Sequence, residues 1–157
     1  MTDDISALVA RYCAGVGLVE AALASLSEDQ LDRAVDGEWT PRMVVHHLAD
    51  SETNSYVRLR RLLAEPNGTV IQGYDEDAWS RTPALGYATE PIDLSLAVLR
   101  AVRAASAELL TRLIDSDFER TGVHTESGPY TLRDWLRIYA EHAEQHAEQI
   151  LAVRAGS

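Results

Sequence analysis

The chain has 157 residues, 46% of them hydrophobic, which fits one globular domain spanning residues 1–157. Its formal net charge of −11 argues against nucleic acid and anionic membranes as partners, because both bind basic surfaces. All 14 cations are Arg, so lysine Schiff-base chemistry is excluded, and the single Cys excludes an internal disulfide. We find no signal-peptide pattern and no apolar run approaching the roughly 20 residues of a membrane span, and we expect a cytoplasmic protein without membrane partners.

The first predicted helix covers residues 3 to about 26. Apolar side chains recur there at spacings of three and four, the period of a helix with one buried face. Cys13 lies beside this apolar stripe, and we expect it to be a small core residue rather than a nucleophile. Ser27, followed by Gln30, is a capping box that predicts a short helical turn.

Three further long helices follow. The second begins at Thr40 and Pro41, a cap followed by proline at the first helical position, and continues to about Ala64. The third begins near Pro91, with an apolar stripe reaching residue 113. The fourth begins at Thr131, has Asp134 as a weaker capping-box partner, and reaches residue 153. Alternating strand patterns are nearly absent, so we predict an all-α four-helix bundle.

The connection between the second and third helices, residues 65 to 90, is long for a bundle. It could be a crossover that lets these two helices run parallel, a lid over a site, or both. A shorter connection over residues 116 to 130 contains His124, which we expect to be solvated.

The fourth helix carries His142 and His146, which lie one turn apart on the same face. A helical wheel places both inside or at the edge of the buried arc. Burying an unpaired imidazole nitrogen costs on the order of 1–3 kcal/mol, and a divalent metal would satisfy one nitrogen on each ring. Hydrogen-bonded core histidines remain an equal alternative at this point.

The second helix offers a third candidate ligand. His46 and His47 are adjacent, so only one of them can face such a site, and the wheel does not choose between them. Glu52 falls in the middle of the apolar arc of this helix. It could support a ligand or be the buried partner of an Arg, or it could mark a relaxed helix end or a contact between subunits.

Several of these motifs resemble the DinB-like superfamily of four-helix-bundle metalloproteins. A Trp-Thr pair is followed by a histidine-containing helix, and the last helix carries the spaced histidine pair; the matching residues are Trp39, Thr40, His47, Leu48, Ala49, Glu52, His142 and His146. The chain is most similar to the branch of metal-dependent hydrolases also described as bacterial thiol S-transferases. Matches to that branch are residues 46–51, 54–56, 58, 74–76, 79, 117–121 and 131–139.

The resemblance implies a three-histidine site for one divalent cation on His47, His142 and His146, and it selects His47 over His46. It also implies a homodimer. The branch tends to have additional histidines where this chain has Gln145 and Gln149, a departure that bears on the substrate rather than on the ligands. Zinc or nickel is the expected ion, although iron and copper also suit imidazole ligands.

Three ligands leave a metal open, which is typical of catalytic sites. We therefore expect an enzyme that acts on a small molecule, either a low-molecular-weight-thiol S-transferase or a hydrolase, with metal-bound thiolate or water as nucleophile. The alternative is a non-catalytic, stress-related binding module with a structural or vestigial metal. No catalytic side chain is singled out. Candidate substrate contacts are Asp50, Asn54, Arg58, Tyr74 and Trp79, although a solvated helix face, surface ion pairs or a packed loop would also explain them.

Overall fold

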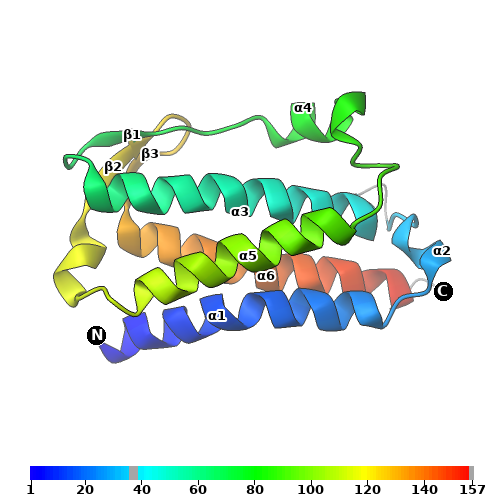
Figure 1. The fold of residues 1–157 in the computed structure, drawn as a ribbon, viewed down its shortest axis with the longest axis horizontal. Helices are drawn as coiled ribbons and strands as arrows, with labels where there is room; N and C mark the ends of the chain where they lie inside the picture. The colour runs from blue at the N-terminus through cyan, green and yellow to red at the C-terminus, as the bar shows by residue number, and fades with distance from the viewer. Residues whose placement is uncertain (36–38, 156–157) are drawn as a thin grey trace.

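Four long helices form the body of the molecule in the computed structural model, which describes residues 1–35 and 39–155 (Figure 1). These helices are α1 (Asp3–Ala24), α3 (Pro41–Ala64), α5 (Asp93–Leu110) and α6 (Leu132–Ala155). Two short helices, α2 (Glu28–Leu31) and α4 (Glu76–Arg81), and two 3-10 turns, η1 (Pro83–Leu85) and η2 (Asp115–Glu119), lie in the connections. The predicted all-α four-helix bundle is confirmed.

The order of the helices around the bundle is α1, α6, α3, α5. Figure 1 shows that α1 and α6 run in one direction and that α3 and α5 both run in the other. The connection after α3 therefore has to return along the length of the bundle before α5 can begin. The predicted crossover between two parallel helices is confirmed, and the length of residues 65–92 follows from it.

The helix starts follow the predicted caps. The Thr40 hydroxyl accepts a hydrogen bond from the Met43 backbone N–H at 3.3 Å, and Pro41 occupies the first helical position of α3. At the start of α6, the Asp134 N–H donates to Thr131 Oγ1 and the Thr131 N–H donates to Asp134 Oδ2, both at 3.0 Å. This reciprocal pair is the capping box that the sequence predicts.

A small sheet at one end of the bundle was not expected from the sequence. Its strands β1 (Thr69–Ile71), β2 (Thr121–His124) and β3 (Gly128–Thr131) have the order β1-β2-β3. β1 pairs with β2 in parallel and β2 pairs with β3 in antiparallel. Strands of three or four residues are too short to produce a clear alternating pattern, which is why the sequence does not reveal them. The sheet joins the long connection to the one that precedes α6.

Two expectations about α1 need correction. An 18-residue window of this 22-residue helix has a mean hydropathy of 1.5, so the helix is long and apolar enough to cross a membrane by length and composition. One of its faces, with Ile5, Tyr12 and Val19, is nevertheless buried in the bundle, and core helices of soluble proteins pass the same test. Cys13 is exposed rather than part of the core, because it lies next to that buried face and not on it.

Candidate metal centre

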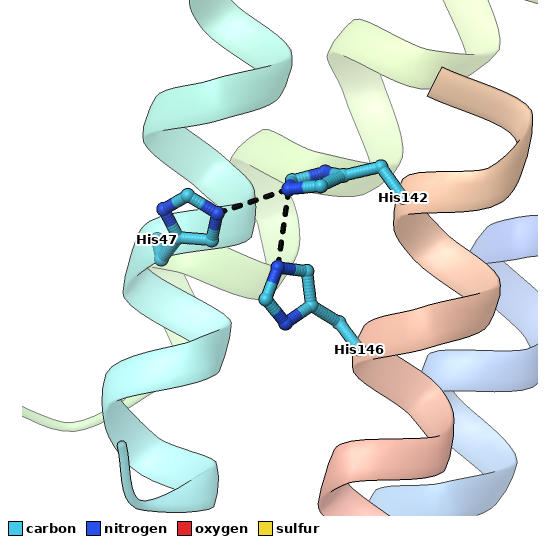
Figure 2. A group of neighbouring side chains, drawn as sticks. All are labelled: His47, His142 and His146. Carbon is cyan, nitrogen blue, oxygen red and sulfur yellow. Dashed lines mark hydrogen bonds between the residues drawn. The ribbon is translucent and has the colours of Figure 1, made fainter. Parts of the chain in front are cut away.

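Three imidazole rings from two helices point toward one another (Figure 2). His47 lies in the second turn of α3, and His142 and His146 lie one turn apart on α6. The Nε2 atom of His142 is 3.0 Å from Nε2 of His47 and 3.1 Å from Nε2 of His146. Residues separated by 95 positions in the chain are thus brought into contact at one point.

The hydrogen-bonding pattern of the rings leaves lone pairs facing the centre. Nδ1 of His146 is 2.8 Å from Gln149 Oε1, and because a carbonyl oxygen only accepts, Nδ1 carries the proton and Nε2 presents its lone pair. The buried Nδ1 atoms of His47 and His142 have no hydrogen-bond partner among the described residues. A single proton on Nε2 of His142 cannot fully satisfy two neighbouring ring nitrogens, whereas a cation between the rings would satisfy all three lone pairs.

Burial keeps the rings of His47 and His142 neutral. The pKa of His47 is lowered to about 3, first by burial and then by the neighbouring His146. The pKa of His142 lies well below its ordinary value, again chiefly through burial, with smaller contributions from His146, His47 and Arg103. Metal ligation requires neutral imidazole, so the environment favours the form that binds a cation.

The spacing of the nitrogens also fits a cation. Two imidazole nitrogens, each about 2.1 Å from one ion and about 90–110° apart around it, lie roughly 3.0–3.4 Å from each other. The three histidines each offer one ligand atom, and these atoms all lie within 4.8 Å of one another. Within residues 1–35 and 39–155, this group has no fourth His, Cys, Asp or Glu, so a bound ion would keep open coordination positions.

The structure separates the two adjacent histidines of α3. Both ring nitrogens of His46 are engaged, Nδ1 with Ser95 Oγ at 2.8 Å and Nε2 with the Glu90 carbonyl oxygen at 3.1 Å. His46 thereby joins both the end of the long connection and the start of α5 to α3. His47 faces the other histidines instead, and the Trp39 ring packs against it with a centroid separation of 4.8 Å.

Glu52 is the buried partner of an Arg, one of the alternatives that the sequence left open. It forms an ion pair with Arg103 of α5 and accepts a hydrogen bond from the Tyr12 hydroxyl at 3.3 Å. Arg103 was not predicted as this partner, although an Arg that shares the inner face of α5 with Leu99, Ser106 and Leu110 is a signal for a buried ion pair.

The five candidate substrate residues fall into two groups. Three lie at the long connection: Tyr74 and Trp79 belong to it and their rings pack at 4.6 Å, and Asp50 of α3 accepts from the Tyr87 hydroxyl at 2.6 Å. The other two, Asn54 and Arg58, make contacts that hold the fold. Asn54 donates to the Asp50 carbonyl of its own helix at 2.9 Å, and Arg58 binds Gln72 and Tyr139.

His124 is half-buried rather than solvated, which corrects the expectation from the sequence. Its Nδ1 accepts from the backbone N–H groups of Glu126 at 3.3 Å and Ser127 at 3.4 Å. Burial is the main cause that lowers its pKa from the ordinary value. This ring belongs to the β2–β3 hairpin and is not in the three-histidine group.

A four-helix bundle with three converging histidines defines a class of candidate metalloproteins, and known proteins share the fold. The sequence profile of the DinB superfamily matches residues 17–150, and the chain belongs to this superfamily. The chain is 37% identical over 137 residues to an Oceanobacillus iheyensis protein named "Putative metal-dependent hydrolase", covering 87% of this chain and 77% of that protein. A Bacillus mycoides protein with the same description is 37% identical over 134 residues, covering 85% of this chain and 75% of the relative.

The chain also resembles a solved structure along almost its whole length. YfiT from Bacillus subtilis is described as a probable metal-dependent hydrolase with an unusual four-helix bundle topology. The two structures match with a TM-score of 0.89 and 32% sequence identity, over 99% of this chain and 90% of YfiT.

Proposed function

We propose that this protein is a metal-dependent enzyme that binds one divalent cation through His47, His142 and His146 and acts on a small molecule. The observation that supports this most strongly is the convergence of three Nε2 atoms from two helices at 3.0 and 3.1 Å. The description of the relatives from Oceanobacillus and Bacillus as metal-dependent hydrolases agrees with it. Zinc or nickel is the proposed ion, because imidazole ligands suit both.

The proposed reaction is either hydrolysis or the transfer of a low-molecular-weight thiol to an electrophile. A divalent cation bound there would act as a Lewis acid that lowers the pKa of a bound water or thiol. The chain itself supplies neutral imidazoles through burial, and Gln149 fixes the ring of His146. Trp39 packs on His47, and the Tyr87 ring lies 6.3 Å from Trp39, so these two aromatic rings support the position of His47.

Metal analysis of purified variants tests the ligand set. His142→Ala should lose the stoichiometric metal that elemental analysis detects in the wild-type protein, because two imidazoles bind a cation far more weakly than three. His124→Ala is the matched control, since its ring lies outside the group. Full metal content in His142→Ala would refute the proposed site.

Activity assays distinguish the reactions. The metal-loaded protein is incubated with monochlorobimane and a panel of bacterial thiols, and separately with generic esters and amides. Conjugation supports the transferase and ester or amide cleavage supports the hydrolase. If neither occurs while the metal remains bound, the protein is instead a non-catalytic, stress-related binding module with a structural or vestigial metal.

We also propose that the protein is a cytoplasmic homodimer formed from single-domain chains. Sedimentation equilibrium of the metal-loaded protein tests the oligomeric state. A mass near the 17.3 kDa of one chain at every concentration would refute the dimer.

A further inference from the structure

The three histidines differ in what holds the ring nitrogen on the far side of each ring from the group. Nδ1 of His146 is 2.8 Å from Gln149 Oε1, whereas the buried Nδ1 atoms of His47 and His142 have no hydrogen-bond partner among the described residues. Gln149 lies three residues after His146 on α6, and side chains at this spacing are neighbours on a helix. One ring of the three therefore has an acceptor that fixes both its tautomer and its orientation.

This acceptor is a neutral amide and not a carboxylate. Histidine ligands of metals usually donate their other ring N–H to a carboxylate, a backbone carbonyl or water, and these partners orient the ring and raise its basicity. A carboxylate also adds a negative charge, whereas an amide oxygen orients the ring without that charge. Three neutral imidazoles and an amide would leave a bound divalent cation with its full double positive charge.

Carboxylates elsewhere in the site do not replace the missing charge by contact with the rings. Within the described ranges, the group of candidate ligands contains no Asp or Glu. Glu52 is neutralised by its buried ion pair with Arg103, and Asp50 accepts a hydrogen bond from the Tyr87 hydroxyl at 2.6 Å. Neither carboxylate is bonded to a ring of the group, so the charge at the histidines would be set mainly by the cation.

We propose that Gln149 is a positioning residue that orients His146 and, as a neutral partner, keeps the metal site electropositive. The open coordination position then takes an anionic donor atom of the small molecule, a thiolate sulfur or a carboxylate oxygen. The second statement rests on the proposed function, because it requires the cation. The first statement concerns a hydrogen bond that forms without the metal, and it is tested separately.

The tautomer of His146 tests the hydrogen bond in the metal-free protein. NMR correlation spectra of the imidazole rings, recorded at a pH of about 8 where imidazole is neutral, distinguish a proton on Nδ1 from a proton on Nε2. Wild-type His146 should carry its proton on Nδ1. Gln149→Leu should lose this preference, and Gln149→Glu should retain it because a carboxylate also accepts. A proton on Nε2 of His146 in the wild-type protein would overturn the assignment.

Cobalt affinity, measured by competition with a chelator, tests the effect of positioning on the metal. Gln149→Leu should weaken cobalt binding about 10- to 100-fold, the usual effect of removing the partner of a ligand histidine. Gln149→Glu should bind cobalt more tightly than the wild-type protein, since it keeps the acceptor and adds a negative charge. Gln145→Glu is the matched control, because it adds the same charge at an exposed position of α6, where solvent screens it, and should leave the affinity nearly unchanged. Wild-type cobalt affinity in Gln149→Leu would contradict the positioning role.

Azide, a small anion, tests the charge at the open position of the cobalt-loaded protein through the visible absorption spectrum. Gln149→Glu should weaken azide binding roughly 10- to 30-fold, the order expected for one unit charge about 9–10 Å away at an effective dielectric constant of about 20. Gln145→Glu should change it little. Equal azide affinity in Gln149→Glu and the wild-type protein would overturn the electropositive site. If the wild-type protein binds no cobalt, the proposed function fails and the anion site fails with it, whereas the tautomer still decides whether Gln149 orients His146.

Discussion

Arg103 and Glu52 form an ion pair in the centre of the bundle, where their side chains are 2% and 0% exposed. The same guanidinium donates from Nε to the Tyr12 carbonyl oxygen at 2.9 Å and from Nη2 to the Tyr139 carbonyl oxygen at 2.8 Å. One side chain therefore connects all four long helices. Tyr139 is one turn from His142, so the same contact helps to fix α6 next to the histidine group.

Removal of Arg103 should destabilise the protein strongly. Arg103→Met leaves the Glu52 charge buried without a partner, and we expect a loss of about 3–5 kcal/mol in the free energy of unfolding, measured by urea denaturation. Arg100→Met, which removes an exposed pair with Glu20, should cost about 1 kcal/mol or less. Similar losses in both variants would contradict the role assigned to the central pair.

Gly15 gives a second test of the same packing. A Cβ on Gly15 would lie 2.7 Å from Arg103 Nη2 and 2.7 Å from the Cβ of Ala143, so Gly15→Ala should cost about 1–3 kcal/mol. Gly17→Ala lies on the same helix with nothing within 4 Å of the added methyl group, and it should stabilise the protein by up to about 1 kcal/mol. Denaturation curves in which both variants shift in the same direction would show that the contact with Arg103 does not matter.

The metal-free protein should lose stability in acid. The pKa of His47 is about 3 in the folded state, below its ordinary value of 6.5. Below pH 6.5 the His47 imidazole therefore binds a proton more strongly in the unfolded chain than in the folded protein. The contribution of His47 to stability is complete above pH 6.5 and decreases toward pH 3 by roughly 1.4 kcal/mol per pH unit.

Chemical denaturation of the metal-free protein across this pH range measures the slope. In His47→Gln the slope should become smaller, because the ring that titrates is absent. An unchanged slope would mean that His47 is not the group responsible.

A bound cation should raise the melting temperature. A ligand present at 100 times its dissociation constant stabilises the folded state by about 2.7 kcal/mol, which corresponds to a shift of roughly 5–10 °C for a domain of this size. Differential scanning fluorimetry with zinc and then with excess chelator measures this shift. It should disappear in His142→Ala, and a shift of equal size in that variant would place the cation elsewhere.

Local patterns in the sequence predict much of the fold. Thr40, Pro41, Thr131 and Asp134 mark helix starts through chemistry that depends only on neighbouring residues, and the structure has them as expected. The spacing of His142 and His146 also follows from helix geometry alone. These features are local, so one sequence is enough to reveal them.

Long-range contacts could not be derived in this way. The pairing of β1 with β2 joins Thr69 to Gly122, and the partner of Glu52 lies 51 positions away. The choice between His46 and His47 depends on Ser95 and Glu90, which are close only after the chain has folded. Cys13 was wrongly expected in the core because a position at the border of an apolar stripe can face either way.

The wide separation of His47 and His142 along the chain has a consequence for biosynthesis. Because α3 and α6 are brought together only across nearly 100 residues, the cluster of three rings cannot exist on a ribosome-bound chain until the last helix has emerged. Until then His47 lies in a partly synthesised chain without contact to His142 or His146. The three-histidine group therefore assembles late, only after α6 is available to pack against α3.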